Sequence, residues 1–361
     1  MNRILVVDDS LLYRKIVRDA LSGDPDLEVI GMAADGAACL QKIPVLRPDV
    51  ITLDIEMPIL DGLGVLRALR ATEDAPGVVL LSSCSSINAS LTATALRLGA
   101  FDFIVKPSAD SATAGAAKLK SKLLPVIKCC LESRRVPALH PDGSTQPATL
   151  TPPARHLETS PANRETLPPR IVAIGTSTGG PKALASILPK LPADFPTPLV
   201  IVQHMPAYFT RSLAEELDGL SNIRVVEAEN GMAVTPGWAY VAPGGRQMKI
   251  VAGGAYGQVR ITDDAPVGNC RPAVDYLFDS LPGIFGGQIL AVVMTGMGCD
   301  GTASCKTLSS YGATVIAQDE QSSTVFGMPG QVVAAGLAND ICPLEKLPSL
   351  IVSYCRGGQM A

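Results

Sequence analysis

Four polar positions in the first third of the chain have the residue types that phosphoryl transfer needs. Asp8 and Asp9 follow one short apolar run, Asp54 follows another and Lys106 follows a third. Clustered carboxylates repel one another unless a cation holds them, and oxygen ligands with room for water suit Mg²⁺. Asp54 could then attack a phosphoryl donor, while the metal ion and Lys106 balance the charge on the phosphoryl oxygens. The Ser82 hydroxyl would donate to one of those oxygens.

Two questions about these residues stay open. Acids at strand ends often only cap the following helix, and Asp9-Ser10 has the residue types of an N-cap. Ser83 stands beside Ser82 and carries the same hydroxyl, although we favour Ser82.

A serine in the second half lies in a pattern typical of a nucleophile. Gly175-Thr176-Ser177-Thr178-Gly179 fits G-x-S-x-G, which places a serine on a tight strand-to-helix turn with its hydroxyl exposed. Backbone amides at the helix start could supply an oxyanion hole. The alternative is a phosphate-binding loop, because such amides also attract anions. However, this segment matches neither GxGxxG nor GxxxxGK[ST].

A serine nucleophile needs a base, and the chain has three histidines. His140 and His156 lie in a proline-rich stretch that cannot hold them rigidly, which leaves His204 at the end of an apolar run. Asp300, also directly after an apolar run, would fix the imidazole tautomer. The order Ser, His, Asp differs from that of α/β-hydrolases and argues against that fold. Asp300 could also cap the next helix, and both roles could hold at once.

The elements that must position these residues follow from short β-branched runs that alternate with amphipathic segments, a pattern typical of βα units. The first half predicts a doubly wound sheet, which binds ligands outside the carboxyl ends of its strands. Its strands are expected at 3–7, 27–32, 49–53, 77–82 and 101–105, and its helices near 10–22, 36–46, 62–72, 87–98 and 114–133. The second half predicts strands at 170–175, 198–202, 289–294 and 313–317 and a hairpin at 247–262.

Between the two halves, residues 136–169 hold eight prolines and no aromatic residue, which is the composition of an extended linker. The predicted organisation is therefore an N-terminal α/β domain (1–135), this linker (136–169) and a C-terminal α/β domain (170–361).

Composition excludes several classes of protein. With 47% hydrophobic and 18% charged residues, the chain is not a long disordered protein. A net charge of −4 leaves no basic excess for phosphates, which argues against nucleic acid as the main partner. There is no apolar run of the roughly 18 residues that span a bilayer and no signal-peptide core. The nine scattered cysteines suit a reducing compartment, so we expect a cytoplasmic protein without membrane insertion.

The N-terminal motifs resemble those of response-regulator receiver domains, in order and in spacing. The matching segments are 6–10 (VVDDS), 53–58 (LDIEMP) with 61–62 (DG), and 105–107 (VKP). The resemblance covers about residues 1–125 and implies a flavodoxin-like domain with Asp54 as phosphoacceptor. It also implies a Mg²⁺ ion held by Asp8, Asp9, Asp54 and the carbonyl of Glu56. Phe103 falls where such domains place a switch aromatic, although it could equally be a core residue.

The C-terminal motifs look like those of chemotaxis protein-glutamate methylesterases. The matching segments are 174–181 (IGTSTGGP), 203–206 (QHMP) with 209–210 (FT), 242–245 (APGG), 271–275 (RPAVD) and 295–301 (TGMGCDG). The resemblance implies a Rossmann-like α/β serine hydrolase with Ser177 as nucleophile, His204 as base and Asp300 as orienting acid. It also implies oxyanion donors among the backbone amides near Thr178 and Met297.

One position departs from the family pattern. Gln247 stands where the family usually carries histidine, and we interpret it as a supporting residue.

The resemblance implies a reaction and its control. Ser177 would attack the γ-glutamyl methyl ester of a methylated chemoreceptor, with loss of methanol and hydrolysis of the acyl-serine by water. The same groups would deamidate receptor glutamines. The esterase would need no cofactor, whereas phosphorylation would need Mg²⁺ and a chemotaxis histidine kinase as phosphodonor. The unphosphorylated N-terminal domain is expected to cover the catalytic face, and phosphorylation of Asp54 to weaken that packing.

Other functions remain as alternatives. The chain could be a phosphorylation-controlled binding module on an inactive hydrolase fold, which the intact set Ser177, His204 and Asp300 argues against. A nucleotide-binding effector is disfavoured by the missing phosphate-loop lysine. The same esterase could also serve a chemosensory pathway other than flagellar swimming.

Overall fold

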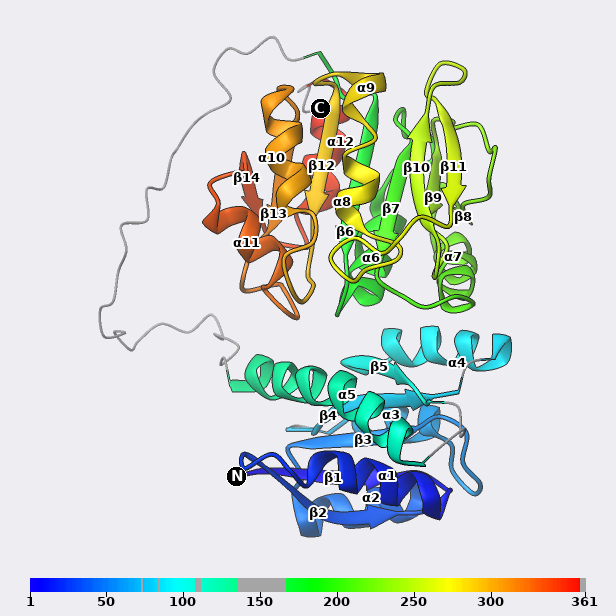
Figure 1. Ribbon diagram of the computed structural model, residues 1–361, viewed down its shortest axis with the longest axis vertical. Helices are drawn as coiled ribbons and strands as arrows, with labels where there is room; N and C mark the ends of the chain where they lie inside the picture. Colours follow the sequence, from blue (N-terminus) through cyan, green and yellow to red (C-terminus); the bar gives the residue numbers. More distant parts are fainter. Residues whose placement is uncertain (73, 84, 108–111, 136–166, 358–361) are drawn as a thin grey trace, which may run out of the picture.

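The computed structural model describes residues 1–357 except 73, 84, 108–111 and 136–166 (Figure 1). The elements β1 to α5 form an N-terminal domain, and β6 to α12 form a C-terminal domain. The predicted linker lies almost entirely outside the described residues, so the boundaries at 135 and 170 stay predictions. Within the described ranges, no helix combines the length and the apolar character that crossing a membrane requires.

The N-terminal domain is built on five parallel strands in the order β2-β1-β3-β4-β5. The strands are β1 (Asn2–Val7), β2 (Leu27–Ala33), β3 (Val50–Asp54), β4 (Gly77–Ser82) and β5 (Asp102–Val105). The helices are α1 (Leu11–Leu21), α2 (Gly36–Leu46), α3 (Gly62–Leu69), α4 (Ser86–Arg97) and α5 (Ala112–Arg135). This is the predicted doubly wound arrangement, and every predicted strand and helix is found within a few residues of its expected place.

The C-terminal domain is built on seven parallel strands in the order β14-β13-β12-β6-β7-β9-β8. The strands are β6 (Ile171–Thr176), β7 (Leu199–Gln203), β8 (Arg224–Glu227), β9 (Trp238–Val241), β12 (Ile289–Val293), β13 (Thr314–Gln318) and β14 (Asp340–Cys342). A separate antiparallel hairpin consists of β10 (Gln247–Val251) and β11 (Gln258–Thr262). The helices are α6 (Gly180–Ile187), α7 (Phe209–Leu220), α8 (Val274–Phe278), α9 (Pro282–Phe285), α10 (Thr302–Ser310), α11 (Met328–Ala334) and α12 (Leu347–Cys355), and a 3₁₀ turn spans Leu188–Lys190.

The four predicted C-terminal strands and the predicted hairpin are confirmed. Three further strands, β8, β9 and β14, were not predicted. Each has only three or four residues, which is too short for alternation or an apolar run to distinguish a strand from a loop.

The helices of the two domains begin by different means. At four helix starts in the N-terminal domain, the side-chain oxygen of a capping residue accepts a hydrogen bond from a backbone N–H. The capping residues are Ser10, Asp35, Asp61 and Ser85. The predicted cap at Ser10 is therefore confirmed. In the C-terminal domain, α6 and α10 instead follow Gly179 and Gly301, whose φ angles of 80° and 92° favour glycine. A Cβ at Gly179 would also lie 2.5 Å from Thr324, so the turn that carries Ser177 requires glycine.

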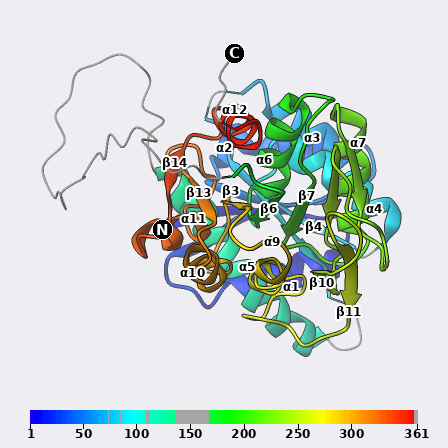
Figure 2. The same ribbon diagram turned by 90° about the horizontal axis from the view of Figure 1, so that it is seen from above.

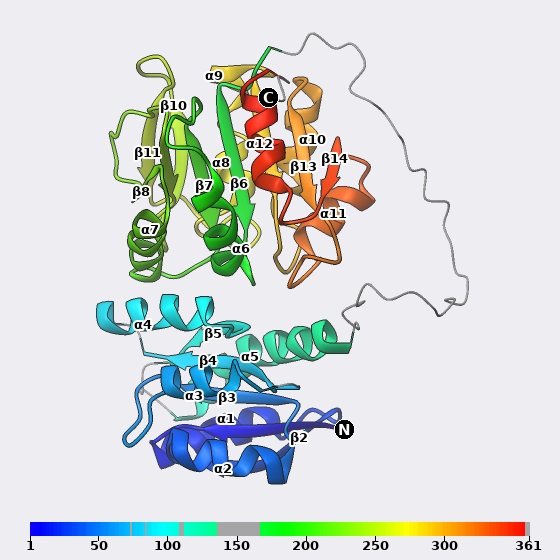
Figure 3. The same cartoon turned by 180° about the vertical axis from the view of Figure 1, so that it is seen from behind.

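The two domains are stacked in the closed arrangement that the resemblance implied. The carboxyl ends of β6 and β12 point toward the N-terminal domain, and α4 lies against α6 and α7 (Figures 1 and 3). Seen from above, the C-terminal domain lies over the N-terminal one (Figure 2). One buried apolar cluster runs without interruption from the N-terminal sheet into the C-terminal domain. The edge that holds the candidate hydrolase residues is therefore the edge that the N-terminal domain covers.

Candidate functional site

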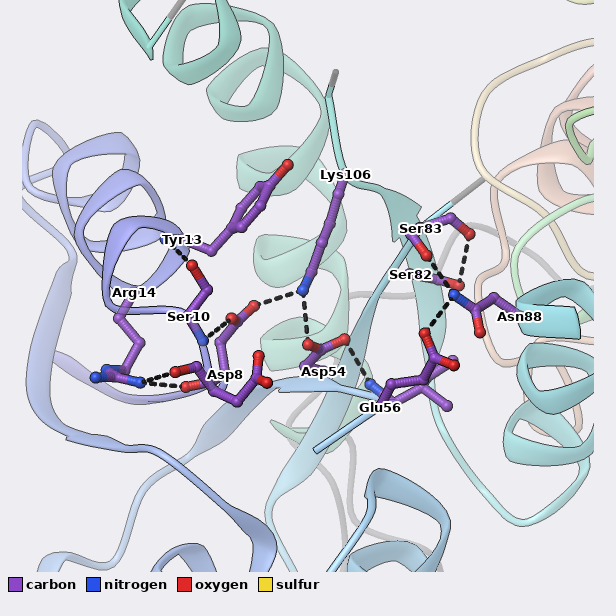
Figure 4. Close-up of polar contacts among 12 residues, drawn as sticks. Asp8, Ser10, Tyr13, Arg14, Asp54, Glu56, Ser82, Ser83, Asn88 and Lys106 are labelled. Carbon is purple, nitrogen blue, oxygen red and sulfur yellow. Dashed lines mark hydrogen bonds and ion pairs between the residues drawn. The ribbon is translucent and has the colours of Figure 1, made fainter. Parts of the chain in front are cut away.

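Side chains that follow β1, β3 and β5 meet at one edge of the N-terminal sheet (Figure 4). Lys106 Nζ lies 2.7 Å from Asp54 Oδ2 and 2.7 Å from Asp8 Oδ2. One carboxylate oxygen from each of Asp8, Asp9 and Asp54 lies within 4.8 Å of the other two. A set of oxygen donors at this spacing, with Asp9 open to solvent, fits Mg²⁺ and its bound waters.

One lysine offsets part of the negative charge at this cluster. Burial raises the pKa of Asp54, against the opposing effect of its hydrogen bond to Lys106. Burial also works against protonation of Lys106, but the hydrogen bonds and ion pairs with Asp54 and Asp8 outweigh it and raise the pKa of the lysine. Lys106 therefore stays charged and forms ion pairs with two carboxylates that are almost fully buried.

The neighbouring polar side chains bond to α4. The Glu56 carboxylate accepts a 2.8 Å hydrogen bond from Asn88 Nδ2, and the role of the Glu56 carbonyl as a metal ligand stays a prediction. Ser82 is 1% exposed, and its Oγ accepts a 3.0 Å hydrogen bond from Thr92 Oγ1. Asn88 also donates to Ser83 Oγ, so Ser82 and Ser83 both accept a hydrogen bond from a side chain of α4 (Figure 4). No sequence motif had indicated Asn88.

The aromatic side chain of β5 contacts the other domain. Phe103 stacks on Phe209 at the start of α7, with ring centroids 4.6 Å apart and an interplanar angle of 29°. An exposed ion pair between Arg97 and Glu216 lies between α4 and α7. Phe103 therefore lies at the domain interface, which the motif position alone had left undecided between a switch and a core role.

A second interface contact reaches the turn that carries the candidate nucleophile. Thr178 is 5% exposed, and its Oγ1 donates a 2.5 Å hydrogen bond to Asp102 Oδ2 of the N-terminal domain. The Thr178 carbonyl accepts a 2.9 Å hydrogen bond from Thr295 Oγ1. Met297 packs against the apolar cluster of the N-terminal domain. Both segments expected to supply oxyanion donors thus touch the N-terminal domain.

Ser177, His204 and Asp300 follow three neighbouring strands, β6, β7 and β12. His204 Nε2 lies 2.7 Å from Asp300 Oδ2. The His204 backbone N–H donates to the Thr176 carbonyl at 3.1 Å, and the Ser177 N–H donates to the Thr295 carbonyl at 3.0 Å. These bonds fasten the end of β6 to the ends of both neighbours, so the serine turn lies directly beside the histidine.

Asp300 is held by backbone donors rather than by its own helix. Its two oxygens accept hydrogen bonds from the N–H groups of Val274 (2.7 Å) and Asp275 (2.9 Å). Asp275 Oδ1 in turn accepts from the N–H groups of Gly301 (3.1 Å) and Ser304 (2.8 Å) at the start of α10. The alternative that Asp300 caps this helix, which the sequence had left open, does not hold, because Asp275 accepts those N–H groups.

The histidine is strongly basic in this arrangement. Burial disfavours its protonation, but the hydrogen bond to Asp300 and the contact with Cys270 outweigh burial and raise the pKa of His204 to about 9. Burial of Asp300 is likewise outweighed by its hydrogen bond to His204, so the pKa of Asp300 is lowered. The Cys270 sulfur lies 3.9 Å from His204 Nδ1, a contact that no sequence motif had indicated.

Gln247 is fully buried and bonds only to backbone in the loop before α8. Its Nε2 donates to the carbonyls of Ala265 (3.3 Å) and Cys270 (3.2 Å), and its Oε1 accepts from the Ala273 N–H (2.9 Å). These contacts are those of a residue that supports the loop.

The chain is similar to known proteins over nearly its whole length. The family model described as CheB methylesterase matches residues 172–351, and the response regulator receiver domain model matches residues 4–117. The protein-glutamate methylesterase/protein-glutamine glutaminase of Desulfotalea psychrophila is 46% identical over 355 residues and covers 97% of each chain. The protein of the same name from Bacillus licheniformis is 41% identical over 374 residues and covers 99% of each chain.

Solved structures give the same result for the C-terminal domain. The CheB methylesterase catalytic domain of Thermotoga maritima is 42% identical, with a TM-score of 0.50, and covers 52% of this chain and 99% of that one. Within a receiver domain, the cluster of Asp8, Asp9 and Asp54 is typical of a Mg²⁺-dependent phosphorylation site. The chain therefore belongs to the family of protein-glutamate methylesterases/protein-glutamine glutaminases, the chemotaxis hydrolases in which a receiver domain precedes and regulates a CheB methylesterase domain.

Proposed function

We propose that Ser177, His204 and Asp300 act as nucleophile, base and orienting acid in the hydrolysis of γ-glutamyl methyl esters on chemoreceptors. The observation that carries this proposal is the 2.7 Å contact between His204 Nε2 and Asp300 Oδ2, beside the turn that presents Ser177. A carboxylate bonded to one ring nitrogen fixes the tautomer and leaves the other nitrogen as the base.

Each atom has a proposed step in this reaction. Because Nε2 is bonded to Asp300, Nδ1 of the neutral imidazole would take the Ser177 proton. With the pKa of His204 raised to about 9 in the closed structure, this neutral form would predominate only above that pH. The serine oxygen attacks the ester carbonyl, and the tetrahedral oxyanion collapses as the imidazolium returns the proton to the departing methoxide, which leaves as methanol. Water then attacks the acyl-serine with the same nitrogen as base. A glutamine amide follows the same course and releases ammonia. Backbone amides near Thr178 and Met297 are the proposed oxyanion donors.

Asp54 is the proposed phosphoacceptor, with a chemotaxis histidine kinase as phosphodonor. Asp8, Asp9, Asp54 and the Glu56 carbonyl would hold Mg²⁺, which when bound neutralises charge on the phosphoryl oxygens. Lys106 already lies 2.7 Å from Asp54, so it would pair with a phosphoryl group on that oxygen. The Ser82 hydroxyl donates to the Ser83 carbonyl at 3.3 Å, and we expect it to donate to a phosphoryl oxygen instead.

Regulation would pass from this site to the interface through adjacent strands. Ser82 ends β4, and Phe103 on β5 pairs with Leu80 of β4 in the sheet. A change in the Ser82–Thr92 bond alters the position of α4, and a change in Phe103 removes its stacking on Phe209. Phosphorylation thus shifts the population from the closed arrangement to an open one that admits a receptor.

The experiment that tests the hydrolase is methanol release from methylated receptors by full-length protein treated with a small-molecule phosphodonor. Ser177→Ala should abolish release, whereas Ser310→Ala, at an exposed serine that ends α10, should leave it unchanged. A serine-directed alkoxyphosphonate probe should label the wild type and not Ser177→Ala. Methanol release that persists in Ser177→Ala would refute the assignment. Asp54→Asn should remove the response to the phosphodonor.

We place the protein in the cytoplasm, as expected from composition. The eight cysteines that the structure describes are free of disulfide bonds, which suits a reducing compartment. The mild charge of −4 suits a protein substrate rather than nucleic acid.

A further inference from the structure

Three metal-ligating side chains meet in the methylesterase domain, well apart from the receiver acids. One atom from each of His204, Cys270 and Asp300 lies within 4.8 Å of the other two. The cluster contains a thiol, unlike the oxygen-only cluster at Asp54. Cys270 is half-buried and free, so its sulfur is accessible to a small ion from solvent.

A rigid turn fixes the position of Cys270. The Cys270 N–H donates to the Val267 carbonyl at 2.8 Å, and the Val267 N–H donates back to the Cys270 carbonyl at 3.1 Å. The central residues Gly268 and Asn269 have φ angles of 57° and 65°, as in a tight hairpin turn of type I′. Gln247 Nε2 adds a third bond to the Cys270 carbonyl. The backbone that carries the sulfur is thus held from two sides.

The ring nitrogen of His204 that is not bonded to Asp300 faces the Cys270 sulfur. His204 Nε2 is bonded to Asp300, and Nδ1 lies 3.9 Å from Cys270 Sγ. A histidine that binds a metal through one nitrogen commonly donates its other N–H to a carboxylate, which orients the ring and raises its basicity. Zinc bonds of 2.3 Å to sulfur and 2.0–2.1 Å to nitrogen place the two ligand atoms about 3.6 Å apart in a tetrahedral site. The observed spacing differs from this by a few tenths of an ångström, which a small side-chain rotation supplies.

We propose that Cys270 and His204 Nδ1, with Asp300 as the orienting carboxylate, form a site for a thiophilic divalent cation of the Zn²⁺ class. Binding replaces the thiol proton and any proton on Nδ1, so the metal–sulfur and metal–nitrogen bonds form with release of protons to water. Thiolate and imidazole ligands favour Zn²⁺, whereas Mg²⁺ prefers oxygen. The protein therefore holds two clusters with opposite metal preference.

Occupation of this site inhibits the esterase reversibly. The bound ion occupies the Nδ1 lone pair that would otherwise accept the Ser177 proton. Only two protein side chains hold the ion and water completes its coordination, so a chelator can remove it. Structural zinc sites, by contrast, use four protein ligands. This consequence rests on the proposed role of His204 as base, whereas the binding itself does not.

The experiment uses full-length protein washed with chelator, and Co²⁺ as a spectroscopic probe for Zn²⁺. Co²⁺ should produce a near-ultraviolet thiolate-to-metal charge-transfer band in the wild type and in Cys299→Ser, the matched control at an exposed cysteine. The band should be lost in Cys270→Ser and in Cys270→Ala, and Zn²⁺ should compete it away in the wild type. A band that persists in both Cys270 variants would overturn the proposal.

Activity gives the second measurement. With phosphodonor present, Zn²⁺ should inhibit methanol release by the wild type and by Cys299→Ser at concentrations at least about tenfold below those needed for Cys270→Ser, since even the loss of a supporting contact weakens metal sites 10–100-fold. Equal sensitivity of the wild type and Cys270→Ser would overturn the inhibitory role. Because the Co²⁺ band does not depend on catalysis, a band that appears while Ser177→Ala retains esterase activity would refute the proposed mechanism and leave the metal site supported.

Discussion

The Thr178 hydroxyl donates its hydrogen bond across the domain interface, to the Asp102 carboxylate 2.5 Å away. Thr178 follows the proposed nucleophile directly, and Asp102 begins β5 of the receiver domain. This hydrogen bond therefore joins the receiver domain to the turn that carries Ser177, and it contributes to the stability of the closed state.

Asp102→Ala should raise the activity of the unphosphorylated enzyme. The substitution leaves the nearly buried Thr178 hydroxyl without its partner in the closed state, at a cost of about 1–3 kcal/mol, so the open population and the basal rate of methanol release should rise roughly fivefold or more. The phosphorylated rate should stay near that of the wild type. Asp19→Ala, which removes an exposed acid paired with Arg18 on α1, is the matched control. An unchanged basal rate would show that this bond does not restrain the enzyme.

Inhibition by the receiver should weaken as pH rises. Burial raises the pKa of Asp102, against the hydrogen bonds from Thr178 and from the Phe103 N–H. We expect separation of the domains to expose this carboxyl, so the closed state should bind its proton more tightly than the open state. Stabilisation of the closed state is complete below the ordinary pKa and is lost as pH rises through the raised one.

The direction of this pH dependence is checked by dividing the activity of the unphosphorylated enzyme by that of the phosphorylated enzyme. The titration of His204 affects both rates, so the ratio removes its effect. The ratio should increase with pH in the wild type and should be flatter in Asp102→Asn, which has no proton to lose. A ratio that falls with pH would contradict the assignment.

Phe103→Ala should increase basal activity more than Arg97→Gln does. The stacked pair of Phe103 and Phe209 is worth about 0.5–1.5 kcal/mol beyond the area it buries. The Arg97–Glu216 pair has an arginine exposed by 46%, and exposed ion pairs contribute about 0–1 kcal/mol. Methanol release without phosphodonor measures both effects, and thermal unfolding shows whether each receiver domain remains folded. Equal rates for the two variants would rule out stacking as the stronger contact.

Gln247→Leu should lower both stability and activity. The leucine has a similar size but leaves the buried Ala273 N–H without its partner, at a cost of about 1–3 kcal/mol, and it removes the hydrogen bonds to the Ala265 and Cys270 carbonyls. Because that loop also carries Cys270 and the Val274 N–H that holds Asp300, loss of order there should reduce kcat. Gln258→Leu, at a partly exposed position on β11, is the control. A variant with the wild-type Tm and kcat would show that Gln247 is dispensable.

Local sequence patterns predicted most of the fold. The fully buried strand β12 is a continuous apolar run because helices cover both faces of its sheet, and the cap at Ser10 needs only the residues of its own turn. Short strands such as β8 and β14 could not be predicted, because three or four residues carry no period and their pairing depends on distant neighbours.

Sequence by itself determined which residues could react: a glycine-bounded Ser177, a single histidine outside the proline-rich stretch, and acids after strands. These follow from residue type and from the rule that parallel strands end at one edge. Only the tertiary structure decided that Nε2 of His204 is the nitrogen bonded to Asp300 and that Asp275 caps α10. The tertiary structure also decided that the Cys270 sulfur lies beside His204 Nδ1 and that Asp102 accepts a hydrogen bond from Thr178. Each of these contacts joins groups from elements that lie far apart in the sequence, and tertiary packing brings such groups together.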